Sequence, residues 1–384
     1  MTAALVRTIG DFDLAEELVQ EALLEAIEHW PREGIPEKPG AWLLTTARRK
    51  ALDQLRRQAR YRDKLAQLEG AANLMRDDTA EGDDRLRLIF ICCHPALSRE
   101  AQVALTLRAV AGLTTAEIAR AFITSEATIA QRIVRAKRKI VDANIPYRVP
   151  AERDIGERLD EVLAVLYLMF NEGYLATGGE RASRRDLAED AAWLAGLMVR
   201  LMPDEPEALG LLALMRLHLA RADTRFDDAG NLILLQDQDR SRWDQERVAS
   251  AMVLLQRAAS LRRTGPYQIQ AAIAACHAEA RTWAQTDWRQ IIALYDALIE
   301  LSPSAVVQLN RAIARRYLDG TEVALSDVEA LAEALDGYYL FHATRAELLR
   351  DLARESEARQ AIARALELTA NPAERALLQR RLGN

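Results

Sequence analysis

Two short stretches of this chain concentrate cationic side chains. The ten residues Gln131 to Ile140 contain five cations and no acid, and Arg48 to Arg62 contain seven cations and one acid, Asp53. Side chains at this density neutralise the phosphates of a polyanion, and a local basic patch matters more to such binding than the charge of the whole chain. The formal net charge is −6, so these residues predict local binding of a nucleic acid.

Residues that could carry catalysis or hold a metal form no constellation in the sequence. The chain has no phosphate-binding glycine loop and no dinucleotide fingerprint, and its five histidines are scattered without metal-ligand spacing. Cys92, Cys93 and His94 are adjacent, but neighbours on a helix diverge by about 100° and do not readily converge on one ion. We therefore predict no enzymatic activity, no cofactor and no metal, and we expect the cysteines to be reduced core thiols.

The composition indicates a mainly helical protein. The chain has 384 residues, enough for two or three domains with substantial cores, and 50% of them are hydrophobic while only 5% are aromatic. No apolar run approaches the roughly 18 residues of a membrane span, and the N-terminus lacks the layout of a signal peptide. We expect a cytoplasmic protein without a membrane anchor. Residues 1–150 carry a net charge of +2 and the remainder −8, so the acidity belongs to the C-terminal part.

The basic stretch Gln131 to Ile140 belongs to a helix-turn-helix pattern. Thr114 is placed to cap one helix, with Glu117 three residues later as its capping-box partner, and Ser125 is placed to cap the next. In that second helix the spacing of four apolar residues predicts one buried stripe. Measured around the helix axis from Ile129, polar and basic residues fall on an arc from about 180° to 300°. The stripe is Ile129, Ile133, Ala136 and Ile140, and the arc holds Thr128, Gln131, Arg132, Arg135, Arg138 and Lys139. Such a helix fits a DNA major groove.

A simpler interpretation of the same pattern stays open. Two short amphipathic helices with late cations also occur in ordinary helical bundles, where the cations complement the helix dipole. The turn, Ile123 to Ser125, also lacks the glycine often found in such motifs. The rest of the chain must decide between the two.

Two further helices precede this motif. The segment Asp13 to Pro31 predicts an acidic amphipathic helix that a proline ends, followed by a loop to Gly40. A helix from about Ala41 carries the basic stretch Arg48 to Arg62. Its predicted buried stripe is Leu44, Ala47, Ala51 and Leu55, and its predicted opposite face is Arg49, Asp53, Arg56 and Arg60. An acidic stretch from Gly70 to Asp84 is typical of a linker.

The order of these motifs resembles the two-domain core of an extracytoplasmic-function (ECF) sigma factor of the sigma-70 family. The resemblance rests on DLAEELVQEALLEA, AWLLTTARRKALDQLRR and LSREAQVALTLRAVAGLTTAEIARAF, and covers roughly residues 5–142. DDRLRLIFICCHPALS, SEATIAQRIVRAKRKI, VLYLMFNEGY and LLQDQDRSRW further resemble the subgroup with a C-terminal extension related to tetratricopeptide repeats. The chain begins at MTAALVRTIGD, so we expect the first helix of the sigma-two domain to be shorter than the family usually has.

The resemblance implies an all-α fold with four parts. We expect a sigma-two domain at residues 1–69, an acidic linker at 70–84, a sigma-four helix-turn-helix domain at 85–145, and a helical extension at 146–384 that is tetratricopeptide-like from about residue 265. By resemblance the linker would run through the polymerase channel, and it could equally be a disordered spacer.

The resemblance also implies roles for single residues. Contacts to bases or backbone of the −35 element are implied for Ser125, Thr128, Gln131 and Arg132, and phosphate contacts for Arg135, Lys137, Arg138 and Lys139. At the −10 element, the loop Pro36 to Gly40, including Glu37 and Lys38, would cradle a flipped base, and Arg48, Arg49, Lys50, Arg56 and Arg57 would follow the backbone. Asp13, Glu16, Glu17, Gln20 and Glu21 would bind the clamp helices of the largest polymerase subunit, with the polymerase flap as a second contact. For Trp42 we expect packing in the core rather than base stacking.

The C-terminal part shows its own repeat. Tyr295 to Pro303 and Ile362 to Ala370 align as the second helix and exit of a tetratricopeptide-like unit, and their ends lie 67 residues apart, close to two repeats of about 34 residues. Ala346, Ala358 and Ala365 stand where paired helices approach, and the unit between, Ser304 to Gly337, is degenerate. Such a scaffold usually presents a concave surface to a protein or small-molecule partner, although any stack of helical hairpins can show this period.

One stretch of the extension is predicted to be non-helical. Phe226 to Trp243, FDDAGNLILLQDQDRSRW, contains a tight turn and a short apolar run that predict a small β-hairpin insertion. It lacks the alternate oxygen ligands and closing glutamate of a calcium loop. A structural insertion is the default, and the resemblance suggests a regulatory or positioning role. The residues of this regulatory loop are Asp227, Asp228, Gly230, Asp237, Asp239 and Arg240.

Taken together, these features predict a sigma factor that directs RNA polymerase to promoters and is regulated by its C-terminal helical domain. The alternative is a ligand-responsive helix-turn-helix activator with a tetratricopeptide-like sensor. The basic helix from about Ala41 and the acidic helix before it argue against that alternative, because an activator needs neither.

Overall fold

The computed structural model describes residues 2–9, 12–61, 84–122, 124–143, 145, 152–174, 185–227 and 229–383. Within these residues the regular structure is helical, and none of the helices is long and apolar enough to cross a membrane. The all-α prediction is therefore confirmed. The predicted acidic linker lies outside the described residues, apart from Asp84, at which α5 begins.

The chain forms two compact units. Unit 1 comprises Met1–Arg120 and Thr124–Val165, and unit 2 comprises Ala121–Ile123 and Leu166–Asn384. The predicted sigma-two and sigma-four segments both fall almost wholly in unit 1, and most of the predicted extension forms unit 2.

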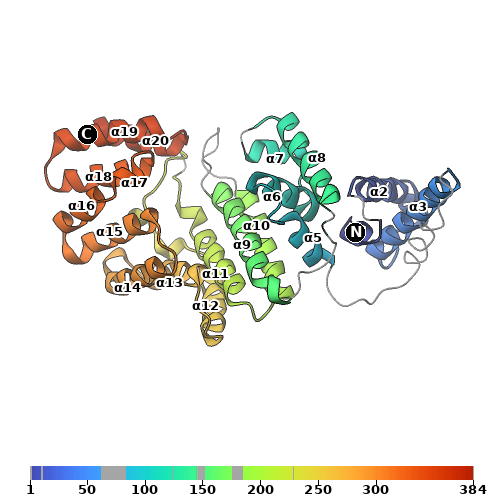
Figure 1. The fold of residues 1–384 in the computed structure, drawn as a ribbon. Helices are drawn as coiled ribbons and strands as arrows, with labels where there is room; N and C mark the ends of the chain where they lie inside the picture. The colour runs from blue at the N-terminus through green and yellow to red at the C-terminus, as the bar shows by residue number, and fades with distance from the viewer. Residues whose placement is uncertain are drawn as a thin grey trace. The chain divides into compact units, whose positions relative to one another are not determined.

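The first three helices of unit 1 pack against one another (Figure 1). They are α1 (Thr2–Ile9), α2 (Phe12–Glu33) and α3 (Pro39–Tyr61). Leu5, Leu18, Ala47 and Ala51 are fully or nearly fully buried where these helices meet. Helix α2 does not stop at Pro31 as predicted. It continues for two residues and ends before Gly34, whose φ of 88° is left-handed and whose N–H bonds to the Trp30 carbonyl at 3.0 Å.

The second group of unit 1 carries the helix-turn-helix. It consists of α5 (Asp84–Cys92), α6 (Arg99–Thr106), a π-helical turn η2 (Leu107–Ala111), α7 (Thr115–Ala121) and α8 (Glu126–Asp142). Phe90, Leu105, Ile118 and Ile129 are each at most 1% exposed. Helix α8 packs against α6, and burial of apolar surface of this kind stabilises the whole group of helices.

Unit 2 begins within α9 (Glu152–Tyr174) and is built around α11. Its first helices are α10 (Arg185–Leu201), α11 (Pro206–Ala220), α12 (Gln245–Ser260) and α13 (Pro266–Glu279). The sequence of α11 is apolar on all sides, so α10, α12 and α13 can pack against it from different directions. Gly210 permits a close approach of α11 and α13, because a Cβ there would lie 2.7 Å from the backbone nitrogen of Gln268.

The remaining helices form successive hairpins (Figure 1). They are α14 (Trp288–Leu301), α15 (Ala305–Asp319), α16 (Thr321–Glu329), α17 (Ala332–Leu335), α18 (Tyr339–Asp351), α19 (Glu355–Leu368) and α20 (Pro372–Gly383). The two segments aligned from the sequence are the C-terminal halves of α14 and α19 with their exits. Ala346, Ala358 and Ala365 are buried in the α18–α19 contact region. The degenerate middle unit contains α15 and a second helix broken into α16 and α17. The extension is therefore helical, and its tetratricopeptide-like character stays a prediction.

The segment between α11 and α12 is irregular. It contains the 3₁₀ turns η3 (Ala222–Thr224), η4 (Leu235–Asp237) and η5 (Arg240–Arg242), and a further 3₁₀ turn, η6 (Trp283–Gln285), precedes α14. The predicted hairpin is reduced to one antiparallel bridge between Phe226 and Leu232. The apolar run that follows turns into η4 instead of pairing as a strand.

Candidate nucleic-acid interface

Both helices of the helix-turn-helix begin at the caps predicted for them. The N–H and hydroxyl of Thr114 each donate to a Glu117 carboxylate oxygen at 2.7 Å, and the Glu117 N–H donates back to the threonine hydroxyl at 3.2 Å. This is a reciprocal capping box. Ser125 accepts the N–H of Thr128 at 3.1 Å and lies in the extended conformation of an N-cap. These caps fix where the second helix starts and therefore which side chains its first turn presents.

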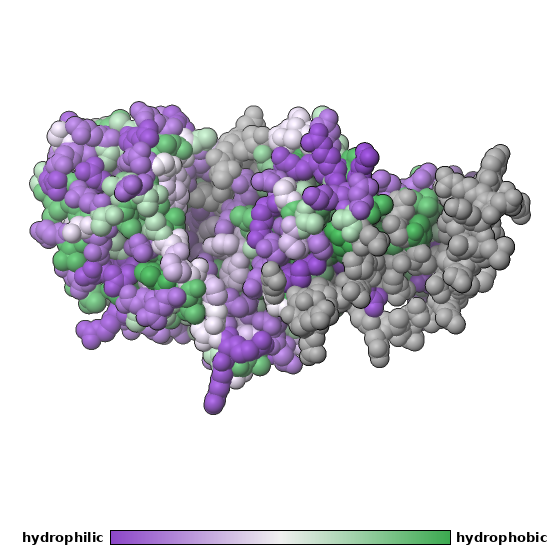
Figure 2. All heavy atoms as spheres, in the orientation of Figure 1, coloured by the Kyte–Doolittle hydropathy of each residue, from purple (hydrophilic) through white to green (hydrophobic). Residues whose placement is uncertain are grey.

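Helix α8 is strongly two-faced. All four residues of the predicted stripe are buried, at 0% to 6% exposure. The opposite face carries the predicted polar and basic residues in exposed positions, except that Arg132 is partly buried. On the face shown in Figure 2, hydrophilic side chains cover much of the surface formed by α7 and α8. A rigid helix with a cationic outer face is thus present where the sequence predicted it.

Lys137 is the exception among the predicted phosphate ligands. At 100° per residue it lies about 80° from Ile129, beside the buried stripe rather than opposite it. The residue is 7% exposed, and its ammonium donates to Asp13 Oδ1 at 2.8 Å and to Glu16 Oε2 at 3.1 Å. One predicted DNA ligand is therefore bound to two predicted polymerase ligands, and its role on phosphate stays a prediction.

The acidic helix α2 presents a single polar face. Measured from the buried Leu18, four of the five predicted polymerase ligands fall between about 160° and 260°, while Glu21 lies near 300°. Those four are Asp13, Glu16, Glu17 and Gln20. Glu21 instead faces α3, where it bonds to Lys50.

The same face of α2 carries two apolar residues that were not predicted to belong to it. Leu24 is 60% exposed and Ile27 is 70% exposed, and they lie at about 240° and 180° from Leu18. Their position off the buried stripe was the signal available in the sequence. Exposed aliphatic side chains next to acids and an amide are typical of a protein-binding patch.

The basic residues of α3 divide into two groups. Arg49 is exposed and Arg48 is partly buried, whereas Lys50 bonds to Glu25 at 2.9 Å and to Glu21 at 3.1 Å. The hydrogen bond that the Lys50 ammonium donates to Glu25 is the main reason that the pKa of Lys50 is raised. The side chains of Arg56 and Arg57 lie outside the described residues.

The loop before α3 is open to solvent. Glu37 and Lys38 are exposed, Pro36 is partly buried, and the helix begins earlier than expected, at Pro39. Trp42 packs edge-on against Trp30 with ring centroids 5.6 Å apart. Trp42 is only partly buried, so its place in the core stays a prediction.

The predicted regulatory loop is held by its own polar side chains. The Asp227 carboxylate accepts the N–H groups of Ala229 and Asn231 at 3.0 and 2.7 Å, and Gly230 takes a left-handed φ of 80°. Asp239 accepts the N–H of Ser241 at 3.0 Å, which starts η5. Hydrogen bonds lower the pKa of both aspartates. The largest contributions come from the side chains of Asn231 and Ser241, and the backbone N–H groups add to them. Asp237 is exposed, and Asp228 lies outside the described residues.

Arg240 fastens this loop to the end of α13. Its Nη1 donates to the carbonyl oxygens of His277, Ala280 and Thr282 at 2.9, 2.8 and 3.3 Å, and its Nη2 to the Thr286 hydroxyl at 3.1 Å. The residue is 8% exposed. One buried guanidinium thus satisfies carbonyls that the ending helix leaves without partners.

The Cys92–Cys93–His94 segment faces the core. Both thiols are buried, and burial raises the pKa of Cys93 to about 12. Its sulfur lies 3.5 Å from the Thr106 hydroxyl, and His94 Nδ1 accepts the N–H of Ala96 at 3.1 Å. No group of three potential metal-binding side chains occurs in the part of the chain that the structure describes.

Comparison with known families assigns three segments of the chain. Residues 2–61 match Sigma-70 region 2, and residues 87–140 match region 4 of the same family. Residues 158–259 match a family of unknown function, DUF6596. The first two matches cover α1–α3 and α5–α8, and the third covers the start of unit 2 together with the regulatory loop.

Two relatives are named as sigma factors, and a third is similar to nearly the whole chain. The ECF RNA polymerase sigma factor SigK of Mycobacterium ulcerans (strain Agy99) is 30% identical over 154 residues, which are 36% of this chain and 79% of that protein. SigL of Mycobacterium tuberculosis (strain ATCC 25618 / H37Rv) is 31% identical over 35% of this chain and 77% of its own. The uncharacterized protein R00370 of Rhizobium meliloti (strain 1021) is 46% identical over 99% of this chain and 92% of its own.

Proposed function

This chain belongs to the extracytoplasmic-function sigma factors of the sigma-70 family, which direct RNA polymerase to promoters, and from that membership we propose how its surfaces divide the work. Its partners as a sigma factor are the polymerase core and promoter DNA. The chemistry of RNA synthesis belongs to the polymerase, so this chain contributes recognition and no catalytic step, and it acts in the cytoplasm with that enzyme. The observation that carries the proposal is the capped helix α8, with its apolar stripe buried and its cationic face exposed.

Helix α8 reads the −35 element. Gln131 and Arg132 lie in its second turn, where a recognition helix reaches base edges, and amide and guanidinium groups pair with adenine and guanine. Ser125 and Thr128 lie at the helix start and bond to each other at 2.8 Å, so they contact backbone through a fixed first turn. Arg135, Arg138 and Lys139 follow along the same face and neutralise phosphates. Lys137 joins them only after it leaves Asp13 and Glu16.

Helix α3 and the loop before it act at the −10 element. The loop residues Pro36, Glu37 and Lys38 hold an extruded base, and Arg48, Arg49, Lys50, Arg56 and Arg57 follow the separated strand. Proteins bind an unpaired strand mainly through cations along its phosphate backbone and less through hydrogen bonds to base edges. Lys50 contributes its charge when Glu21 and Glu25 turn to another partner.

The polar face of α2 binds the polymerase. Asp13, Glu16, Glu17 and Gln20 supply charge for a basic partner such as the clamp helices, with Glu21 at the margin, and α8's domain reaches the flap. Leu24 and Ile27 supply apolar area in the middle of this face, which charge alone does not provide.

Unit 2 regulates the two promoter-reading domains, through a protein or small-molecule partner of its tetratricopeptide-like hairpins. The regulatory loop supports this role, since Asp227 and Asp239 shape it and Arg240 fastens it to α13. Transcription with Asp227→Ala and Asp239→Ala, beside the exposed control Glu246→Ala, tests the loop. Unchanged promoter output and unchanged regulation in both loop variants would exclude the role.

The test of the whole proposal is transcription in vitro with bacterial core polymerase and genomic promoter fragments, with and without this protein. New start sites that share −35 and −10 elements, together with a stoichiometric complex with core, are the expected result. Binding to DNA without a polymerase complex would instead favour a conventional activator. Exchanging Gln131 and Arg132 for alanine should shift or abolish the −35 preference while the complex with core persists.

A further inference from the structure

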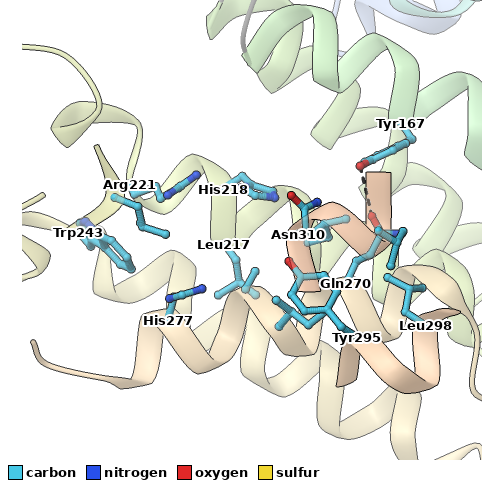
Figure 3. A pocket seen from close by; sticks show the side chains of 15 residues that line it. Tyr167, Leu217, His218, Arg221, Trp243, Gln270, His277, Tyr295, Leu298 and Asn310 are labelled. Carbon is cyan, nitrogen blue, oxygen red and sulfur yellow. Dashed lines mark hydrogen bonds between the residues drawn. The ribbon is translucent and has the colours of Figure 1, made fainter. Parts of the chain in front are cut away.

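Unit 2 contains a cavity that the promoter-reading role does not use (Figure 3). Its volume is about 290 Å³, and α9, α11, α13, α14 and α15 contribute to its walls. Leu235 and Trp243 of the regulatory loop complete the lining. Pockets that hold small molecules measure about 300 to 1,000 Å³, so this cavity suits a compact metabolite.

The lining combines apolar walls with a positive end. Leu217, Ile273 and Leu298 are aliphatic, and Tyr167 and Tyr295 add aromatic surface. Figure 3 shows Arg221, Trp243 and His277 at one end of the view and Tyr167, Gln270 and Tyr295 toward the other. No carboxylate lines the cavity among the described residues.

Arg221 supplies the charge at that end. Its Nε donates to the Tyr174 hydroxyl at 2.8 Å, and within the described residues no acid lies within ion-pair distance of its guanidinium. The other two arginines nearby are committed elsewhere. Arg225 stacks on Tyr174 with 3.7 Å from its Cζ to the ring centroid, and Arg240 donates to the carbonyls at the end of α13. The Nη groups of Arg221 therefore remain available to an anion.

The two histidines of the lining are neutral. Burial, and then the charges of Arg221 and Arg240, lower the pKa of His277 to about 3. Burial lowers the pKa of His218 well below its ordinary value, helped by Arg221 and Arg225. Both rings are therefore hydrogen-bonding groups in a positive field and do not add charge of their own.

Two polar atoms of the lining lack partners. Trp243 Nε1 and His277 Nδ1 are buried and make no hydrogen bond. An indole N–H can only donate, and leaving such a group unpaired costs about 1 to 3 kcal/mol. Both residues belong to the positive end of the cavity. An acceptor oxygen that reached these atoms would satisfy the indole and, with the appropriate tautomer, the imidazole.

We propose that this cavity binds a small organic carboxylate with an apolar or aromatic body. The carboxylate pairs with Arg221 and accepts from Trp243 and His277, and the body lies against Leu217, Tyr295 and Leu298. The aromatic end also offers the Tyr295 hydroxyl and the Asn310 amide to a second polar group. This binding is a property of unit 2 and does not depend on any promoter role.

The first experiment measures binding of 4-fluorophenylacetate to the full-length protein by broadening of its ¹⁹F resonance. We expect saturable broadening that unlabelled phenylacetate reverses. The neutral analogue 2-(4-fluorophenyl)ethanol should bind about tenfold or more weakly, the equivalent of one charge-assisted hydrogen bond. Equal binding of the two probes would overturn the anion selectivity, and no broadening with either would overturn the site.

Two variants locate the binding. Asn310 is exposed at the edge of the cavity, so Asn310→Trp should obstruct the cavity and abolish broadening without disturbing the fold, whereas Gln308→Trp, exposed on the same helix, should leave it unchanged. Arg221→Met should remove the preference for the carboxylate, and Arg242→Met, an exposed loop arginine outside the lining, should not. Undiminished binding by Asn310→Trp, with a native thermal melt, would exclude this cavity.

Discussion

One lysine of the helix-turn-helix contributes to two surfaces at once. Lys137 belongs by sequence to the cationic helix α8, yet in space it completes the acidic helix α2 through Asp13 and Glu16. Arg135 lies two residues before Lys137 and Arg138 one residue after it, and both side chains are on the exposed face. The angular position on the helix, rather than the residue type, decides whether a cation is buried against α2 or exposed.

Exchange of Arg135 and Arg138 for alanine should weaken promoter binding by about the same factor for every sequence, since phosphate contacts carry no base information. The slope of log affinity against log salt should fall by about 1 for each cation that contacts duplex phosphate. Fluorescence anisotropy of the holoenzyme at several salt concentrations measures both. Arg289→Ala with Arg359→Ala removes the same charge from exposed sites of unit 2 and should leave the slope intact.

The ion pair of Lys137 with Glu16 should be measurable as a coupling energy. A double-mutant cycle of Lys137→Met and Glu16→Gln in urea unfolding should give about 1 kcal/mol, because the pair is hydrogen-bonded and largely shielded from water. The exposed pair Arg138–Asp142, with 3.5 Å between charged atoms, provides the comparison and should give less than about 0.5 kcal/mol. Equal couplings for the two pairs would show that the burial of Lys137 adds nothing.

At the scale of elements, the start of α8 is the most constrained point of the helix-turn-helix. The Ser125 cap sets the first turn, and the buried stripe from Ile129 onward sets the rotation of the helix. These two features were predictable because they depend on neighbours within a few residues. The continuation of α2 past Pro31 was not, because a proline only weakens a helix that packing already holds.

Ser125→Ala should destabilise unit 1 by about 1 kcal/mol through loss of the cap, and Ser125→Asn should retain most of that stability. Chemical unfolding measures the loss, and promoter binding by the two variants separates the roles of the residue. If Ser125 also contacts DNA, the asparagine variant will keep stability but lose affinity. Equal stability of the alanine variant and the parent chain would contradict the capping role.

At the scale of the whole molecule, the division of the chain into promoter-reading helices and a helical extension was predictable from the order of its motifs. The cavity of unit 2 was not, because its lining comes from five helices and a loop that span residues 167–310. His218 and His277 looked scattered in the sequence and flank the same space in the structure. Contacts that depend on long-range packing leave no periodic trace in a single sequence.

The free energy of unfolding of unit 2 should begin to decrease at a higher pH than carboxylate protonation alone explains. The pKa of His277 is about 3 in the folded chain against an ordinary value of 6.5. The unfolded chain therefore binds more protons below about pH 6.5, and stability falls as the pH decreases, by up to about 1.4 kcal/mol per pH unit for each such histidine.

Urea unfolding of the full chain between pH 7 and 5 measures this dependence. His277→Phe should make the decrease shallower, whereas His29→Phe, which alters an exposed histidine, should not change it. A slope that is the same in all three proteins would contradict the neutral, buried state of His277.

The contact of Lys137 with Asp13 and Glu16 also has a kinetic meaning. A polymerase that takes these acids, or a phosphate that takes the lysine, replaces a partner that is already in place, so each encounter is a displacement reaction. Displacement of a tethered group proceeds only as fast as that group opens, whatever the concentration of the incoming partner. Association with polymerase should therefore approach a maximum rate at high polymerase concentration, and that plateau should rise when Lys137 is replaced by methionine.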